Sequence, residues 1–432
     1  MTLWSKLLLL LVAGYLTLTR SFAHFGVPAA NLFIGEIAIA AFLLWRPHAV
    51  LENWITALRQ PARLSEFSLA FACFLAYGCF ETIRGLGNGN AILPTLQEFA
   101  FNYYPICFFI GLWLGSADPR LLRKAVRLVA WTNGIYGVLY IAFLNRIPVA
   151  VPGTTDVPLF GQPAGSSIVI LGLLCLEPKL LRVWHLLLIN LLVMLGLQVR
   201  AEFLGFLFGV ALWGLLTRRF DRVFAGFAVL VALLAAGLVV DFRMPAPGTR
   251  GGQISTRDII GRVVAPADPE LAAEYTENAR SLAGTATWRL NWWQRIWDDV
   301  HRDTGTAIFG EAYGFPLADL VGYRERDLRT PHSVFFYALG YGGWVGVAVF
   351  FALQASLGRT LWQAWRASGV PFGPVLWITF LSGACFGNAF ETPFGAIPFY
   401  LLTGLAAAPL CAEVAKQHAY PAGTYVLQTA WR

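Results

Sequence analysis

Long apolar runs constrain this chain more than any other feature of its sequence. A helix must present about 20 apolar residues to cross a hydrocarbon layer roughly 30 Å thick. Twelve runs of about this length recur along the 432 residues, and the sixth is short. They cover approximately residues 3–19, 28–45, 64–83, 95–115, 127–144, 164–177, 183–199, 201–217, 223–240, 332–357, 372–390 and 394–411. The sequence therefore predicts an all-α, polytopic membrane protein with about 12 transmembrane helices.

One long segment between the ninth and tenth runs has the composition of a soluble domain. Residues 241–331 contain 11 arginines and 13 acidic residues, whereas the whole chain is only 13% charged and 57% hydrophobic. A soluble domain is about 25% charged, so this composition excludes a soluble enzyme. We expect helices 1 to 9 in residues 1–240, a loop domain in 241–331, helices 10 to 12 in 332–411 and a tail in 412–432.

The basic residues of the short loops predict how the chain is oriented. One set of loops carries 17 lysines and arginines, whereas the opposite set carries only Arg20, Arg84, Arg146 and Arg200. Because basic loops stay in the cytoplasm, both termini are expected there and the loop domain on the periplasmic side. The net charge of +7 then orients the protein and does not indicate nucleic-acid binding. No convincing cleavage site follows the first run, so we count residues 1–20 as a span and not as a signal peptide.

Ionisable residues in or beside a membrane span require an explanation, because a charge there is costly. Glu36 lies in the middle of a span, and Glu81, Arg84 and Glu98 lie toward the outer ends. Glu81 and Arg84 are three residues apart and can pair on one helix face. The sequence leaves two interpretations open, interhelical hydrogen bonds or a substrate path, and favours the first.

Two residues at the predicted outer surface have the chemistry of a catalytic site. Arg200 stands where the seventh and eighth runs meet, so it either extends toward lipid head groups or clamps a phosphate. His332 follows Pro331 at the start of the tenth run and can move a proton near neutral pH. We favour a catalytic base over a structural histidine. No metal-ligand cluster accompanies it, so no metal is expected.

The second half of the loop domain carries an amphipathic, tryptophan-rich helix, predicted over residues 285–300. Its apolar side either lies on the membrane interface or packs on neighbouring spans, and both arrangements keep Arg289 and Arg295 near the lipid surface. A turn-rich stretch and a polar run follow this helix. They contribute Tyr313 and Arg329, which with Arg295 are candidate substrate-loop residues.

Together these features resemble the O-antigen ligase and polymerase superfamily. The resemblance rests on Arg200-Ala201, the segment 287–293, the turn 310–316 and the segment from Pro331 to Gly343, which opens with Pro-His-Ser. It implies a metal-independent, cofactor-free, inverting glycosyltransferase of the bacterial inner membrane. Such an enzyme moves a glycan from undecaprenyl pyrophosphate to an acceptor sugar on the periplasmic face. By the same resemblance His332 matches the essential histidine, and Arg200 and Arg289 match the arginines that bind the donor pyrophosphate.

The resemblance leaves the acceptor open. A lipid A core would make the protein an O-antigen ligase, and the single long loop favours this outcome. A second lipid-linked repeat would make it a polymerase, and a protein serine would make it an oligosaccharyltransferase. A lipid or solute transporter is the rival class, and it would depend on Glu36. Ser333 and Ala201 stand where asparagine and glycine are common in the superfamily, so these motifs do not identify the branch of the superfamily to which the chain is similar.

Overall fold

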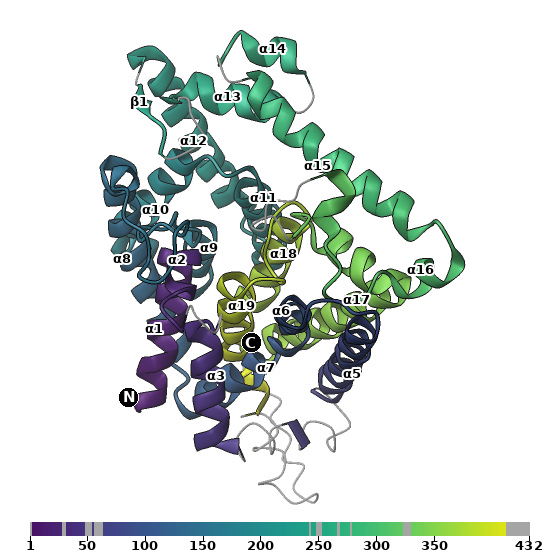
Figure 1. Cartoon of the computed structure of the whole chain (residues 1–432). Coiled ribbons are helices and arrows are strands. Elements are labelled where there is room, and N and C mark those ends of the chain that lie inside the picture. The colour runs from purple at the N-terminus through teal and green to yellow at the C-terminus, as the bar shows by residue number, and fades with distance from the viewer. Residues whose placement is uncertain are drawn as a thin grey trace, which may run out of the picture.

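The computed structural model describes residues 2–27, 32–47, 54–55, 64–241, 243–247, 253–265, 268–276, 279–322 and 330–411. This part of the chain is almost entirely helical (Figure 1). Its one pair of strands, β1 (Met244–Pro245) and β2 (Gln253–Ile254), is antiparallel. The predicted fold class, a helical polytopic membrane protein, is confirmed.

A helix lies at the position of each predicted apolar run. Before residue 241 these are α1 (Leu3–Leu18), α3 (Ile34–Trp45), α5 (Ser65–Gly87), α6 (Ile92–Tyr103), α7 (Ile106–Ala117), α8 (Leu121–Ala142), α9 (Ser166–Leu176), α10 (Trp184–Leu197), α11 (Arg200–Thr217) and α12 (Phe220–Val240). After residue 331 they are α17 (Val334–Ser368), α18 (Phe372–Ala384) and α19 (Pro393–Ala407). Short α2 (Arg20–Ala23) and the 3₁₀ turns η2 (Leu144–Arg146) and η3 (Leu180–Arg182) lie between them.

Not all of these helices are long enough to span a bilayer alone. Among the described residues, six helices are long and apolar enough to cross a membrane. Helices α6 and α7, which meet at a bend of 40°, make a seventh if the two together form one span. The bend falls at Pro105, which lacks a backbone N–H and therefore ends the hydrogen-bond ladder of α6. Five more apolar helices have 10–17 residues. The total of 12 spans stays a prediction.

Helix α19 forms the centre of the bundle and α12 its margin. In α19 78% of the apolar window is buried, whereas in α12 no residue is. Helix α19 packs closely on α7, because a Cβ added at Gly404 would lie only 2.1 Å from the Phe108 carbonyl oxygen. Figure 1 shows α19 between the α1 and α8 side of the molecule and the α5 and α17 side.

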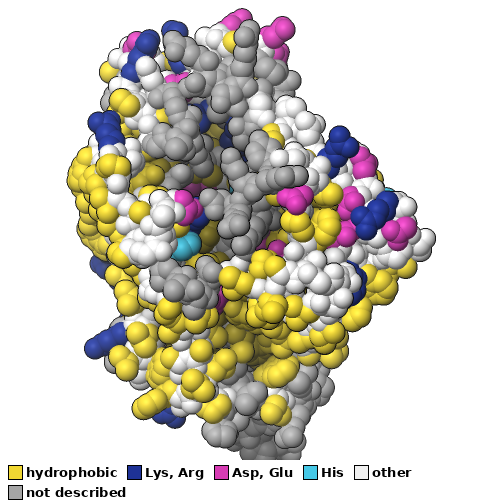
Figure 2. All heavy atoms as spheres, in the orientation of Figure 1, with side chains coloured by type: hydrophobic (Ala, Val, Ile, Leu, Met, Phe, Trp, Pro, Cys, Tyr) yellow, Lys and Arg dark blue, Asp and Glu magenta, His cyan; other side chains and the backbone are white. Residues whose placement is uncertain are grey.

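The described part of residues 241–331, here called the insert, is mostly helical. It contains α13 (Thr256–Val264), α14 (Pro269–Ala273), α15 (Ala279–Val300), α16 (Thr304–Phe309) and the 3₁₀ turn η5 (Leu317–Val321). Helix α15 packs on α17 and leads from α14 to α16 (Figure 1). Apolar side chains cover most of the lower surface in Figure 2, and charged ones gather around α13, α14 and α16.

Candidate active site

His332 occupies a strained turn between the insert and α17. Its φ of 55° lies in the left-handed region, which a bulky residue rarely adopts. Contacts on both sides hold this turn. The Trp293 indole N–H donates to the Pro331 carbonyl oxygen at 2.7 Å, and the Tyr337 N–H donates to the Ser333 carbonyl oxygen at 2.9 Å. A strained residue held from two sides is typical of a functional position.

The tryptophan-rich face of α15 packs on protein. Trp292 is completely buried, and its indole N–H donates to the Leu317 carbonyl oxygen at 2.9 Å. Trp293 stacks on Phe336 at 5.2 Å between ring centroids, and the Trp288 ring lies 6.1 Å from the His332 ring. All three tryptophans therefore pack on protein, and of the two arrangements open from the sequence, packing on a neighbouring span is observed for Trp293, whose ring stacks on α17.

Burial and a neighbouring charge keep the His332 ring neutral. Burial is the larger cause and the positive charge of Arg289 the smaller, and together they lower the pKa of His332 to about 4. The imidazole is therefore unprotonated near neutral pH and has a free lone pair for a proton. This is the state that a general base requires.

Arg289 lies on α15 and reaches the loop between α18 and α19, residues 385–392. Its guanidinium donates to the Phe386 carbonyl oxygen at 3.0 Å. The Phe386 ring in turn lies 6.2 Å from the Trp293 ring. The insert and the 385–392 loop therefore meet beside His332.

Arg200 is the first residue of α11 and approaches the same loop from the other side. A Cβ added at Gly387 would lie 3.6 Å from the Ala201 Cβ, so Gly387 packs on the residue after Arg200. Glu202 fixes this turn, because it accepts a hydrogen bond from the Ser167 N–H at 3.0 Å at the start of α9. The segments that carry Arg200 and Arg289 thus meet at this loop, and His332 lies close enough to Arg289 to sense its charge.

Three polar residues near these segments were not singled out from the sequence. Gln198 is 4% exposed, and neither of its amide atoms has a hydrogen-bond partner among the described residues. The same is true of the Asn388 Oδ1 and of the Glu391 Oε1. The sequence alone could have marked Glu391 as a candidate functional residue, because it is the only charged residue between Arg366 and Glu413. Burial raises its pKa to about 7, and the loop's own N–H groups offset this only in part.

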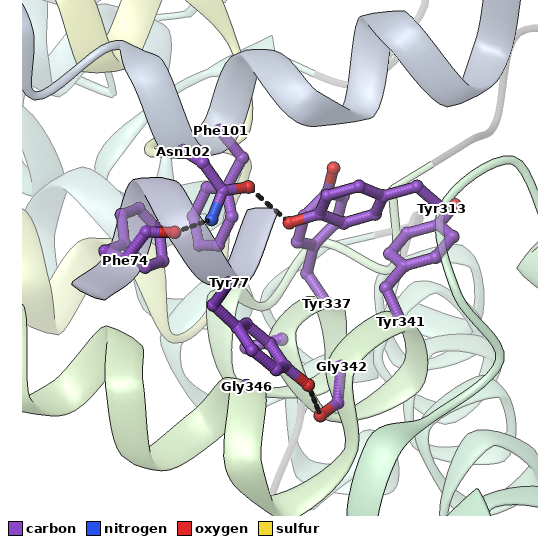
Figure 3. Close-up of a pocket in the computed structure, with 10 residues that line it drawn as sticks. Phe74, Tyr77, Phe101, Asn102, Tyr313, Tyr337, Tyr341, Gly342 and Gly346 are labelled. Carbon is purple, nitrogen blue, oxygen red and sulfur yellow. Dashed lines mark hydrogen bonds between the residues drawn. The ribbon is translucent and has the colours of Figure 1, made fainter. Parts of the chain in front are cut away.

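The structure places the remaining candidates elsewhere. Tyr313 is buried, and its hydroxyl donates to the Asn102 Oδ1 at 2.5 Å, deep between α6 and α17 (Figure 3). Arg295 is exposed on α15. Arg329 lies outside the described residues. In the part of the chain that the structure describes, no group of three or more His, Cys, Asp or Glu residues could hold a metal ion.

The turn around Tyr313, residues 310–316, is anchored by polar contacts on every side. The Gly314 N–H and the Tyr341 hydroxyl donate to the two oxygens of Glu98, at 2.5 and 2.6 Å. Arg84 donates to the Gly310 carbonyl oxygen at 2.6 Å and pairs with Glu81 at 3.3 Å, as the sequence spacing predicted. These contacts join the insert to α5, α6 and the start of α17.

A family model described as O-antigen ligase matches residues 185–351. The matched segment runs from α10 to the middle of α17 and includes Arg200, Arg289 and His332, whereas loop 385–392 lies beyond it. No curated protein matches the chain. The resemblance drawn from the sequence motifs is confirmed at the level of the superfamily.

Proposed function

We propose that this chain is an inverting glycosyltransferase of the bacterial inner membrane, since residues 185–351 match a family model described as O-antigen ligase. Its donor is a glycan on undecaprenyl pyrophosphate, and its acceptor is a sugar hydroxyl presented on the periplasmic face. The observation that carries this proposal is that a neutral His332 lies near Arg289, whose side chain contacts the same loop, 385–392, as the segment of Arg200.

In the proposed mechanism the arginines bind the pyrophosphate and the histidine activates the acceptor. Arg200 and Arg289 neutralise the negative charge that develops on the pyrophosphate as the bond from the sugar C1 to its oxygen breaks. The acceptor oxygen attacks C1 from the opposite face and inverts it, while its proton passes to His332. The products are the glycosylated acceptor and the lipid pyrophosphate. Arginine charge stabilises the leaving group, so the proposal requires no metal ion.

The electrostatic interaction between Arg289 and His332 would couple donor binding to base strength. In the free protein the guanidinium charge lowers the pKa of His332. A pyrophosphate bound to Arg289 would cancel that charge, so the pKa of His332 would rise when the donor is in place. The imidazole would then become a stronger base at the moment the acceptor needs it.

The surroundings of Glu36 argue against the transporter alternative. Its carboxylate accepts hydrogen bonds from the Phe33 N–H and the Tyr103 hydroxyl at 3.0 Å, and from the Tyr104 hydroxyl at 3.2 Å. Glu36 therefore caps the start of α3 and ties it to α6 and to the bend before α7. A carboxylate that accepts hydrogen bonds from three donors of the protein supports the fold and is not a binding site on a substrate path.

Reconstitution of the full-length protein in vesicles tests the proposal. The vesicles would contain a glycan on undecaprenyl pyrophosphate together with a lipid A core acceptor, and transfer would be measured. His332→Ala is expected to reduce the rate about 10² to 10⁴-fold, since that is the usual contribution of a general base. Glu36→Gln is the matched control and should retain transfer. Full transfer by His332→Ala, or loss of function in Glu36→Gln alone, would refute the proposal.

The identity of the acceptor is tested in the same vesicles. We propose the lipid A core, because the protein has one long insert and no second external loop of comparable length. A second lipid-linked repeat and a serine-containing protein would be offered in separate reactions. Transfer to the repeat alone would identify a polymerase, and transfer to the protein alone an oligosaccharyltransferase.

A further inference from the structure

Loop 385–392 contains two buried oxygens that the protein leaves without a partner. Glu391 is 9% exposed, and only one of its carboxylate oxygens is paired, with the Ala389 N–H at 3.1 Å. The other oxygen, Oε1, and the Asn388 Oδ1 have no hydrogen-bond partner among the described residues. Buried polar atoms in a native fold are rarely left unpaired, and exceptions require an explanation.

The position of the loop connects these oxygens to the proposed donor site. The Phe386 carbonyl oxygen accepts the hydrogen bond from Arg289, and Gly387 packs on Ala201, next to Arg200. Asn388 follows directly, and Glu391 stands just before the start of α19. A ligand held by both arginines would therefore have this loop as its neighbour.

The chemistry of the two oxygens selects the part of the donor that they would contact. When Glu391 is ionised, both oxygens are hydrogen-bond acceptors, so they would repel phosphate oxygens and attract hydroxyl groups. The group joined directly to the pyrophosphate is a sugar, which presents several hydroxyls.

We propose that loop 385–392 binds the first sugar of the lipid-linked donor, with Glu391 and Asn388 accepting hydrogen bonds from its hydroxyl groups. This inference rests on the proposed function and extends it from pyrophosphate binding to sugar recognition. The arginines hold the part that every such donor shares, and the loop reads the part that differs between donors. Glu391 is a specificity residue under this assignment, whereas His332 remains the base.

Two lipid probes separate sugar recognition from pyrophosphate binding. The first is farnesyl pyrophosphate, which has no sugar, and the second is the same lipid pyrophosphate carrying one N-acetylglucosamine. Binding of each to the full-length protein in lipid nanodiscs would be measured. The unsubstituted protein is expected to bind the sugar-bearing probe more tightly. In Glu391→Ala the affinity for the sugar-bearing probe should fall about 10 to 100-fold, as expected for the loss of a hydrogen bond to a charged group. Its affinity for farnesyl pyrophosphate should not change.

Two further variants keep the test decisive if Glu391→Ala folds poorly. Glu391→Gln and Asn388→Ala are smaller changes in the same loop, and each should lose part of the same gain. Glu177→Gln is the matched control. Glu177 is also a buried glutamate, but both of its oxygens are bonded to Arg127 at 2.7 Å, at the end of α9 farthest from Ser167. This variant should bind both probes as the unsubstituted protein does.

Several results would overturn the inference. Equal weakening of both probes by Glu391→Ala would indicate a structural role, and an intact sugar-dependent gain would exclude sugar contact. Loss of the gain on adding EDTA to the unsubstituted protein would assign the oxygens to a cation. A changed KM for the acceptor with unchanged donor binding would move the contact to the acceptor sugar. Absence of any glycan transfer by the unsubstituted protein would instead refute the proposed function.

Discussion

Two loops of the molecule differ in how a buried glutamate beside or within them is hydrogen-bonded. In the 310–316 turn, both oxygens of Glu98 accept hydrogen bonds, one from Gly314 and one from Tyr341. In loop 385–392, Glu391 is buried to the same degree, yet one of its oxygens has no partner in the described part of the chain. Burial is therefore the same in the two loops, and hydrogen-bond satisfaction differs.

The difference separates polar groups that hold the fold from those available to a ligand. Satisfied buried polar networks fix a unique packing, and the 310–316 turn shows this role by joining the insert to α5, α6 and α17. An unsatisfied buried acceptor costs stability, and folds usually retain such groups at functional sites. The comparison predicts that substitutions in the first loop reduce stability, whereas substitutions around the second reduce activity.

The largest expected difference is between two arginines, Arg289 at the 385–392 loop and Arg84 at the 310–316 turn. Arg289→Met should lower glycan transfer about 10² to 10³-fold, the usual effect of removing one group that stabilises transition-state charge. Its thermal stability should change little, because the Arg289 hydrogen bond to the Phe386 carbonyl oxygen is exposed to solvent. Arg84→Met should do the reverse and lower the free energy of unfolding by about 1 to 3 kcal/mol. Transfer rates and thermal melting of both variants in nanodiscs check this prediction.

The comparison fails if the two arginine variants behave alike. A strongly destabilised Arg289→Met would show that this side chain also holds the insert in place. A stable but inactive Arg84→Met would indicate that the 310–316 turn takes part in catalysis. Arg295→Met is a useful control, because Arg295 is exposed on the same helix as Arg289.

The helices of this fold were predictable from the sequence, because each long apolar run produced a helix near its expected bounds. His332 was expected at the start of the tenth apolar run, and it lies two residues before α17 begins at Val334. Whether the tryptophan face of α15 meets lipid or protein was not, because both surfaces select the same apolar periodicity. Only the packing of Trp292 and Trp293 in the folded chain decides it.

The partners of the candidate residues could not be predicted, because they come from distant parts of the chain. Tyr313 was expected to contact substrate, yet its hydroxyl finds Asn102, and no local pattern links the two residues. Loop 385–392 lies outside the matched family segment and carries no motif. Its single charge, Glu391, was visible in the sequence, but neither its burial nor its missing partner could be known without the tertiary structure.

A smaller effect is expected in the pH dependence of catalysis. His332 must be neutral to accept a proton, so kcat/KM should fall as the pH drops through about 4, the pKa of this residue. Removing the Arg289 charge raises the pKa of His332 toward its ordinary value, although burial, the larger cause, still holds it lower. In Arg289→Met the acidic limb should therefore move to higher pH, whereas in Arg84→Met it should not move. An NMR titration of the labelled imidazole provides a second measurement. An acidic limb that does not move in Arg289→Met would show that the Arg289 charge does not affect the pKa of His332.

The smallest expected effect comes from Tyr313→Phe in the satisfied loop. This change removes only the hydroxyl that donates to the Asn102 Oδ1, and the ring keeps its place against Tyr341 at 5.7 Å between centroids. Loss of one buried hydrogen bond should lower the free energy of unfolding by about 1 kcal/mol. Transfer per folded molecule should stay unchanged, because the hydroxyl is enclosed between α6 and α17 (Figure 3). A stable variant with tenfold slower transfer would instead place Tyr313 in contact with substrate, and the contrast between the two loops would no longer hold.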